Sequence, residues 1–213
     1  MHQVRRQAHE RSIGGRPVDN ADEGVTEWLS PTPDVPASQY SLGTRPRLVT
    51  WNTFEMIANG RQFVFGTTHL EAINRGHRKK SAVQLREYIS RKVDQMGSET
   101  PVFLTGDFNA VSSSPEIRAM GSDLGNNLAP MFDAWAEACA GGDCPDGDTF
   151  RGLGLRDKVS HKLLGPRRID YVFFRPRLAL QSVRRIDFAG LEHREQALPS
   201  DHYPVLAEFS LAG

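Results

Sequence analysis

The sequence lacks the features that mark several classes of protein. Its 26 basic and 26 acidic residues cancel, so no overall field attracts nucleic acid. No apolar run is long enough to cross a bilayer. Met1 to Glu10 are charged and show no hydrophobic core of a secretory signal, so the default expectation is a cytoplasmic chain. With neither repeats nor low-complexity tracts, the 213 residues predict one globular domain, or at most two small ones.

Cysteine is also scarce. Cys139 and Cys144 lie close together in a loop rich in glycine and aspartate. Free thiols and a disulfide are both compatible with two cysteines at this spacing. A zinc site is not expected, because no second Cys or His pair accompanies them.

The first half of the chain carries clear local signals. Residues 1–27 are polar without periodicity, so we expect an extended or disordered lead-in. Three prolines in the segment 28–36 exclude helix and favour an ordered loop. Two strands over residues 47–70 flank Asn59-Gly60, a pair typical of a tight turn, and predict a hairpin. Apolar residues at helical spacing predict a helix over residues 77–96, as in a βαβ crossover.

The second half predicts further strands and short helices. An apolar run over residues 101–105 predicts a buried strand. Ser114-Pro115-Glu116 predicts the start of a short helix, because serine is a good N-cap and proline is tolerated in the first turn. Further elements are expected as a helix over 129–138 and strands over 169–174, 183–188 and 205–211. This mixture predicts an α/β or α+β sandwich.

Polar side chains follow the strand over residues 101–105 where it should leave the sheet. Asp107 and Asn109 are two residues apart, so in an extended chain both point to the same side. A carboxylate and a carboxamide placed in this way can hold a water and a phosphate oxygen. The alternative is an ordinary turn, since Gly106, Asp107 and Asn109 all favour turns.

Three further groups occupy similar positions. His69 ends the second strand of the hairpin, although a lone histidine is more often structural. Asp170 lies in an apolar strand, where a carboxylate needs a partner. A neighbouring arginine could serve, but we expect a buried histidine. Asp201 and His202 precede the final strand, where Asp201 can ligate a hard cation such as Mg²⁺ and His202 can transfer a proton near neutral pH.

Four motifs together resemble the endonuclease/exonuclease/phosphatase superfamily. They are Thr68-His69-Leu70, Gly106-Asp107-Phe108-Asn109, Arg168-Ile169-Asp170-Tyr171 and Ser200-Asp201-His202-Tyr203-Pro204, and they occur in the superfamily's order. The segments 28–36 and 47–70 resemble its bacterial branch of metal-dependent hydrolases. The resemblance covers residues 27 to 211. It implies a deoxyribonuclease I-like two-sheet β-sandwich flanked by helices, which would occupy residues 28–213.

The resemblance also implies roles in the hydrolysis of a phosphoester. Asp107 orients or deprotonates the attacking water, and Asn109 helps hold that water and the phosphate. His69 donates a hydrogen bond to a phosphate oxygen. His202 contacts the phosphate or transfers a proton, while Asp170 orients its ring. These donors would offset the charge that builds in the transition state.

The chain departs from the superfamily in front of His69. Members begin with a strand ending in asparagine and a strand ending in Gln-Glu, whose glutamate is the principal metal ligand. No such Gln-Glu pair precedes His69, and we expect that Asn52 belongs to the hairpin and that Glu55 does not replace the ligand. Asp201 is then the only ligand that the resemblance assigns to a site for Mg²⁺ or Mn²⁺.

Two explanations for this departure stay open. Either the sequence lacks an upstream part of the native enzyme, which could carry a secretory signal, or the shortened chain is real. In both cases the resemblance implies a fold that is incomplete at its N-terminus, with an exposed sheet edge. Open edges pair with other chains, so we expect the 213-residue chain to be poorly soluble or to self-associate.

Two functions of different classes remain. The first is a metal-dependent phosphoester hydrolase that acts on a small molecule, a lipid head group or nucleic acid. The second is a truncated, catalytically weak or inactive remnant that acts as a binding module. A basic run (Arg75, Arg78, Lys79 and Lys80) can flank a phosphate site but is more often a solvated helix start. The neutral overall charge ranks nucleic acid below small or lipid phosphoesters.

Overall fold

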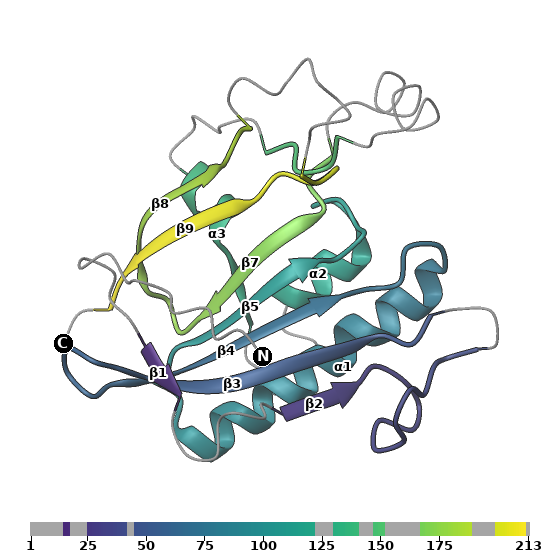
Figure 1. Ribbon diagram of the computed structural model, residues 1–213, viewed down its shortest axis with the longest axis horizontal. Helices are drawn as coiled ribbons and strands as arrows, with labels where there is room; N and C mark the ends of the chain where they lie inside the picture. Colours follow the sequence, from purple (N-terminus) through teal and green to yellow (C-terminus); the bar gives the residue numbers. More distant parts are fainter. Residues whose placement is uncertain are drawn as a thin grey trace, which may run out of the picture.

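The computed structural model describes residues 15–17, 25–41, 45–121, 130–140, 147–151, 167–188 and 199–211. Its strands are β1 (Gly15–Pro17), β2 (Val25–Trp28), β3 (Leu48–Met56), β4 (Gln62–His69), β5 (Val102–Asp107), β6 (Phe132–Asp133), β7 (Asp170–Arg175), β8 (Ala179–Arg185) and β9 (Val205–Ser210). Its helices are α1 (Arg75–Met96), α2 (Pro115–Gly121) and α3 (Ala134–Cys139). They form the mixed α/β, two-sheet architecture that the sequence predicts (Figure 1).

The larger sheet contains seven strands in the order β1-β3-β4-β5-β7-β6, with β2 also paired to β3. The predicted hairpin is present as β3 and β4, and Gly60 takes the positive φ of 72° that its turn requires. The predicted crossover is present too, because α1 connects β4 to the parallel strand β5. Asn74 caps α1 by accepting a hydrogen bond from the backbone N–H of His77.

The two faces of this sheet are covered by different elements. On one face, alternate strand residues such as Trp51 and Leu104 pack against α1 residues such as Leu85 and Ile89. Gly66 makes room for Trp51, since a Cβ at Gly66 would lie 2.2 Å from the indole ring. On the other face, Phe103 packs in a second cluster that includes α3 and the two-stranded sheet of β8 and β9. The period of two along β5 thus supplies both cores.

Four elements differ from the sequence expectations. Residues 15–17 belong to β1 and residues 25–27 to β2, although both were expected in the lead-in, because pairing with β3 gives even polar strands backbone partners. The helix expected over 129–138 begins at Ala134, since Asp133 supplies the N-cap and residues 132–133 pair with β7. The strand expected over 183–188 spans residues 179–185, because its start is fixed by antiparallel pairing with β9.

Two remaining observations concern membranes and cysteines. No helix in the described part of the chain combines the length and apolar character that a membrane span needs. Cys139 is disulfide-bonded, which decides between the two alternatives left open by the sequence. The chain's other cysteine, Cys144, lies outside the described residues.

Candidate active site

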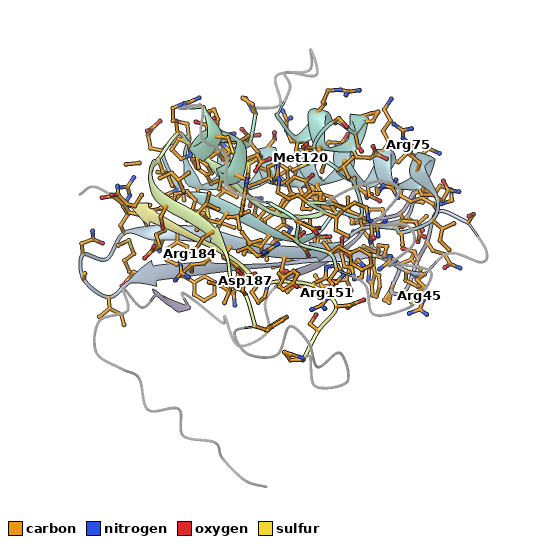
Figure 2. The ribbon with its side chains drawn as sticks, turned by 90° about the horizontal axis from the view of Figure 1, so that it is seen from above. Arg45, Arg75, Met120, Arg151, Arg184 and Asp187 are labelled. Atoms are coloured by element: carbon orange, nitrogen blue, oxygen red, sulfur yellow. The ribbon has the colours of Figure 1, made fainter. Side chains whose placement is uncertain are left out.

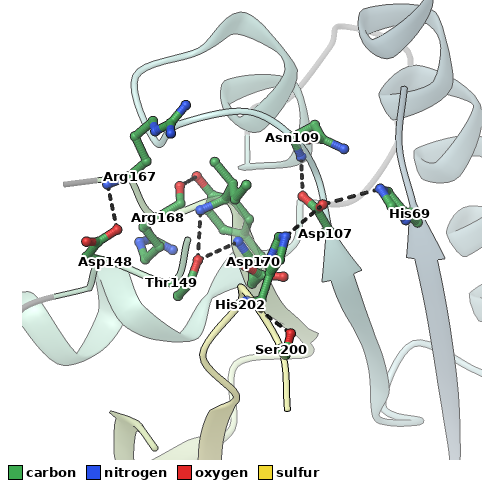
Figure 3. Close-up of polar contacts among 12 residues, drawn as sticks. His69, Asp107, Asn109, Asp148, Thr149, Arg167, Arg168, Asp170, Ser200 and His202 are labelled. Atoms are coloured by element: carbon green, nitrogen blue, oxygen red, sulfur yellow. Dashed lines mark hydrogen bonds and ion pairs between the residues drawn. The ribbon is translucent and has the colours of Figure 1, made fainter. Parts of the chain in front are cut away.

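The ends of three neighbouring strands bring the predicted polar residues together. His69 at the end of β4 lies opposite Asp107 of β5, and Asp107 in turn lies opposite Asp170 of β7. Backbone pairing alone therefore places three of the motif residues in one row across the sheet. Figure 3 shows these side chains with His202, which comes from the segment just before β9.

Asp107 makes polar contacts to both histidines. Its Oδ2 lies 3.3 Å from His69 Nε2 and 3.9 Å from His202 Nε2. The Asp107 side chain is 13% exposed and that of His69 is 58% exposed. The carboxylate is therefore sheltered, while the His69 ring faces solvent.

Gly106 allows β4 and β5 to approach each other beside this contact. Its φ is 146°, and a Cβ at this position would lie 1.9 Å from the backbone oxygen of Thr68. Any side chain there would have to separate the two strands. The close approach of β4 and β5 therefore explains why position 106, next to the site, is a glycine.

Asn109 reaches the site by a different route from the one expected. β5 ends at Asp107, and Asn109 has a φ of 49°, so the two side chains do not alternate along an extended strand. Asparagine tolerates this left-handed conformation better than most residues do. The backbone N–H of Asn109 donates a 2.7 Å hydrogen bond to Asp107 Oδ1, and its Nδ2 donates to the Leu70 carbonyl at 3.0 Å. Asn109 therefore ties together the ends of β4 and β5.

Asp170 pairs with a histidine, which is the partner that the sequence favours. His202 Nδ1 lies 2.9 Å from Asp170 Oδ2, and both side chains are mostly buried. The arginine next in the motif has another partner, because Arg168 makes two hydrogen bonds to Asp133. The other ring nitrogen of His202, Nε2, is the one that faces Asp107.

Thr149 and Phe150 hold this pair in place, and sequence reasoning missed both. The buried Thr149 hydroxyl accepts hydrogen bonds from the backbone N–H groups of Ile169 and Asp170 at 3.0 and 3.1 Å. The Phe150 ring lies 4.9 Å from the His202 ring, and the two residues form an isolated β-bridge. A threonine and an aromatic residue after a loop are too common to signal these long-range contacts.

The surroundings shift the pKa values of three groups in the site. Burial raises the pKa of the Asp107 carboxyl, although the hydrogen bond from Asn109 opposes this effect. Burial lowers the pKa of His69, against the attraction of Asp107. The hydrogen bond to Asp170 raises the pKa of His202. The arrangement therefore favours a proton on His202 over one on His69 and makes Asp107 a stronger proton acceptor.

The donor set for a metal ion is sparse. Within the described residues, no three His, Cys, Asp or Glu side chains are grouped so that they could hold a metal ion. Asp201, the residue that the sequence assigns to the metal, is half-buried, and its backbone oxygen accepts a hydrogen bond from Arg151. The described side chains therefore do not form a Mg²⁺ or Mn²⁺ site by themselves.

Fold and site together define a deoxyribonuclease I-like protein, with a two-sheet sandwich and paired histidines and carboxylates at the strand ends. The chain belongs to the endonuclease/exonuclease/phosphatase family, a family of phosphoester hydrolases whose model matches residues 31–202. This match confirms the resemblance that the four motifs carry.

Known relatives agree with this assignment. Nocturnin of Drosophila melanogaster is 28% identical over 175 residues, which are 73% of this chain and 26% of that protein. An endonuclease/exonuclease/phosphatase structure from Bacteroides vulgatus has a TM-score of 0.68 at 24% identity, covering 93% of this chain and 67% of its own. A mannosyl-6-phosphatase of Bacteroides thetaiotaomicron has a TM-score of 0.64 at 23% identity, covering 94% and 68%. The chain thus spans about a quarter of that Nocturnin and about two thirds of these solved structures.

Proposed function

We propose that this chain hydrolyses a phosphoester with a water activated at the site formed by His69, Asp107, Asp170 and His202. The observation that carries the proposal is the position of Asp107, whose Oδ2 faces both histidines while His202 is held from behind by Asp170. A carboxylate behind a histidine fixes its tautomer and stabilises its protonated form. The same four residues come from separate parts of the chain, so local turn chemistry does not account for their meeting.

The residues divide the chemistry between them. Asp107 accepts a proton from the attacking water as the water oxygen forms its bond to phosphorus. The ester P–O bond breaks, and protonated His202 gives its proton to the departing oxygen or donates a hydrogen bond to the phosphoryl group. His69 donates a hydrogen bond to a phosphoryl oxygen, where negative charge accumulates. The second N–H of Asn109 Nδ2, whose first N–H holds the Leu70 carbonyl, donates another. The exposed His69 ring can reach a bound ester without rearrangement.

A divalent cation, Mg²⁺ or Mn²⁺, is the cofactor that we propose. Such an ion offsets charge on the phosphoryl oxygens when it is bound. Asp201 is the only ligand we assign, and the described side chains lack a three-ligand cluster. A single carboxylate holds Mg²⁺ weakly, so half-saturation should need millimolar metal, and no chemical step above depends on the ion.

The test is hydrolysis of bis(p-nitrophenyl) phosphate with and without Mn²⁺ and a chelator. We expect Asp107→Asn to reduce kcat by about 10²–10⁴-fold, as for loss of a general base. The matched control is Asp187→Asn, which changes a carboxylate that is 58% exposed and should retain full activity. Equal rates in both variants would contradict the assigned role of Asp107. Activity that chelator does not reduce would contradict the metal requirement alone.

The second candidate function is a binding module that keeps the fold without turnover. The missing three-ligand cluster among the described residues is the observation that favours it. Calorimetric binding of inorganic phosphate that His202→Gln weakens, together with no hydrolysis at any metal concentration, would support this function. Measurable turnover would exclude it.

Substrate identity belongs to the proposal as well. Small phosphoesters and lipid head groups rank above nucleic acid, because the chain has no net positive charge. The mannosyl-6-phosphatase among the similar structures is named for a small phosphoester, which is compatible with this order. Hydrolysis that falls steeply with salt would reverse it.

A further inference from the structure

A cavity with Asn109 in its wall lies next to the row of motif residues. Its volume is about 590 Å³. Its wall includes Arg75, Arg78, Asn109, Phe150 and Arg167. Three of these described residues are arginines and none is acidic, so the cavity is a candidate site for an anion.

One buried carboxylate fixes two of the arginines. Glu116 has no exposed side-chain surface, and its Oε1 lies 3.1 Å from Arg78 Nε and 3.6 Å from Arg75 Nε. Arg78 also donates from Nη1 to the carbonyls of Glu71 and Ala72 at 2.9 and 3.1 Å. Three guanidinium groups against this one carboxylate leave two positive charges around the cavity.

Arg167 supplies buried donors to the cavity wall. Among the described residues, its Nε and Nη2 atoms have no hydrogen-bond partner. Its backbone is fixed, because its N–H donates to Asp148 and its carbonyl accepts from Thr149 and Phe150. The guanidinium lies 4.7 Å from the centre of the Phe150 ring. Buried N–H groups without an acceptor are costly, so the guanidinium would gain by turning these donors towards an oxygen anion in the cavity.

The cavity and the proposed reaction site share two walls. Asn109 lines the cavity, and its backbone N–H holds the Asp107 carboxylate. Phe150 lines the cavity as well, and its ring packs on that of His202. In the view of Figure 3, Arg167 and Asn109 lie above Asp170, at opposite sides of the picture. A group held in the cavity is therefore adjacent to a phosphoryl group held between Asp107 and His202.

We propose that this cavity binds a second phosphate of the substrate, with Arg167 and Arg75 as its principal donors. The inference rests on the proposed hydrolase function and deepens it, since it selects esters with two phosphate groups over those with one. The two charges left around the cavity match the charge of a phosphate monoester. A small bisphosphate presents such a monoester, whereas a nucleic-acid strand presents its next phosphate as a diester with a single charge.

The test compares adenosine 3′,5′-bisphosphate with adenosine 5′-monophosphate as substrates. We expect the wild-type protein to prefer the bisphosphate, and Arg167→Gln to lower the ratio of the two kcat/KM values by about tenfold, through KM. Arg75→Gln, at a side chain that is 66% exposed, should lower the ratio in the same direction and serves if Arg167→Gln does not fold. The matched control is Arg184→Gln on β8, which Figure 2 shows on the side of the molecule away from Arg75.

The outcomes separate this inference from the function on which it rests. Hydrolysis of both substrates with no preference, or a ratio that Arg167→Gln leaves unchanged, would overturn the inference alone. If nothing is hydrolysed, calorimetric binding of the bisphosphate still decides: tenfold weaker binding to Arg167→Gln supports the inference, and equal binding overturns it.

Competition by a short single-stranded oligonucleotide identifies the source of the second phosphate. Stronger competition than by the bisphosphate assigns it to nucleic acid, and weaker competition assigns it to a small molecule.

Discussion

At the scale of single residues, the site depends on how the half-buried carboxylate of Asp107 interacts with its neighbours. Asp107 is sheltered from water, yet it faces two histidines and accepts a hydrogen bond from Asn109. Burial is the largest effect on its pKa and raises it, while the nearby His69 opposes the shift. The pH dependence of hydrolysis should therefore report on Asp107.

We predict that the acid limb of kcat/KM lies above the ordinary aspartate pKa of about 3.9. His69→Gln should move that limb further up, because the variant removes a cation that stabilises the carboxylate. The measurement is kcat/KM for a phosphodiester against pH, since the diester stays ionised throughout. His77→Gln on α1 is the matched control and should leave the limb in place. A limb that moves down in His69→Gln would show that a different group titrates.

A second prediction at this scale concerns Thr149, which touches no substrate. Thr149→Val keeps the shape of the side chain but removes the acceptor of two buried N–H groups. We expect a loss of about 1–3 kcal/mol in the free energy of unfolding and a fall in kcat as Asp170 shifts away from His202. Thr149→Ser keeps the hydroxyl and should cost about 1 kcal/mol for its lost methyl group, with kcat near that of the wild type. Denaturant unfolding and kinetics on the three proteins check this, and equal kcat values would refute a positioning role.

At the scale of elements, strand pairing fixes the site more firmly than the loops do. The row of His69, Asp107 and Asp170 follows from the register of β4, β5 and β7. Gly106 is the position where that register is most vulnerable, because the backbone of Thr68 occupies the space that a Cβ would need.

Gly106→Ala tests this dependence, with Gly60→Ala as its matched control. Both glycines have positive φ, but nothing lies within 4 Å of a Cβ at Gly60. We expect Gly60→Ala to cost only the backbone strain, about 1–2 kcal/mol. Gly106→Ala should cost more than that and abolish hydrolysis, since β4 and β5 must separate next to His69. Similar unfolding free energies for the two variants would show that the strands adjust without loss.

Elements with strong periodicity could be predicted from the sequence, and those set by distant partners could not. The hairpin, α1 and β5 have clear signals in turn residues, helical spacing and apolar runs. The polar strand β2 and the two-residue strand β6 exist because β3 and β7 offer backbone partners, which no local pattern reveals. The pair Asp170–His202 was predictable because both residues belong to motifs that occur in the superfamily's order. Its supports Thr149 and Phe150 were not predictable, because they belong to no motif and contact the pair from a distant part of the chain.

At the scale of the whole molecule, the two sheets enclose a groove that is only partly filled. It has a volume of about 1080 Å³, and Phe65, Phe103 and Phe209 are among its apolar lining residues. Phe65 and Leu206, which also lines it, remain 39% and 37% exposed. Within the described residues, β9 pairs with β8 on one edge and has no strand partner on the other. We therefore propose that a second copy of the chain adds its own strand edge here, as open edges and apolar grooves favour. Asp170 and His202 also line this groove, so association through it should cover the proposed reaction site and hydrolysis should fall as oligomers form.

Self-association through this groove is the last prediction. Sedimentation velocity over a range of protein concentrations should show oligomers that increase with concentration. Phe65→Lys should shift the equilibrium towards monomer, because it places a charge inside the apolar groove. Ile73→Lys is the matched control: Ile73 is 92% exposed and lies outside the groove, so its substitution should change association little. A monomer at every concentration would contradict self-association. An equal effect of both variants would show that the groove is not the interface, because Phe65 lines the groove and Ile73 does not.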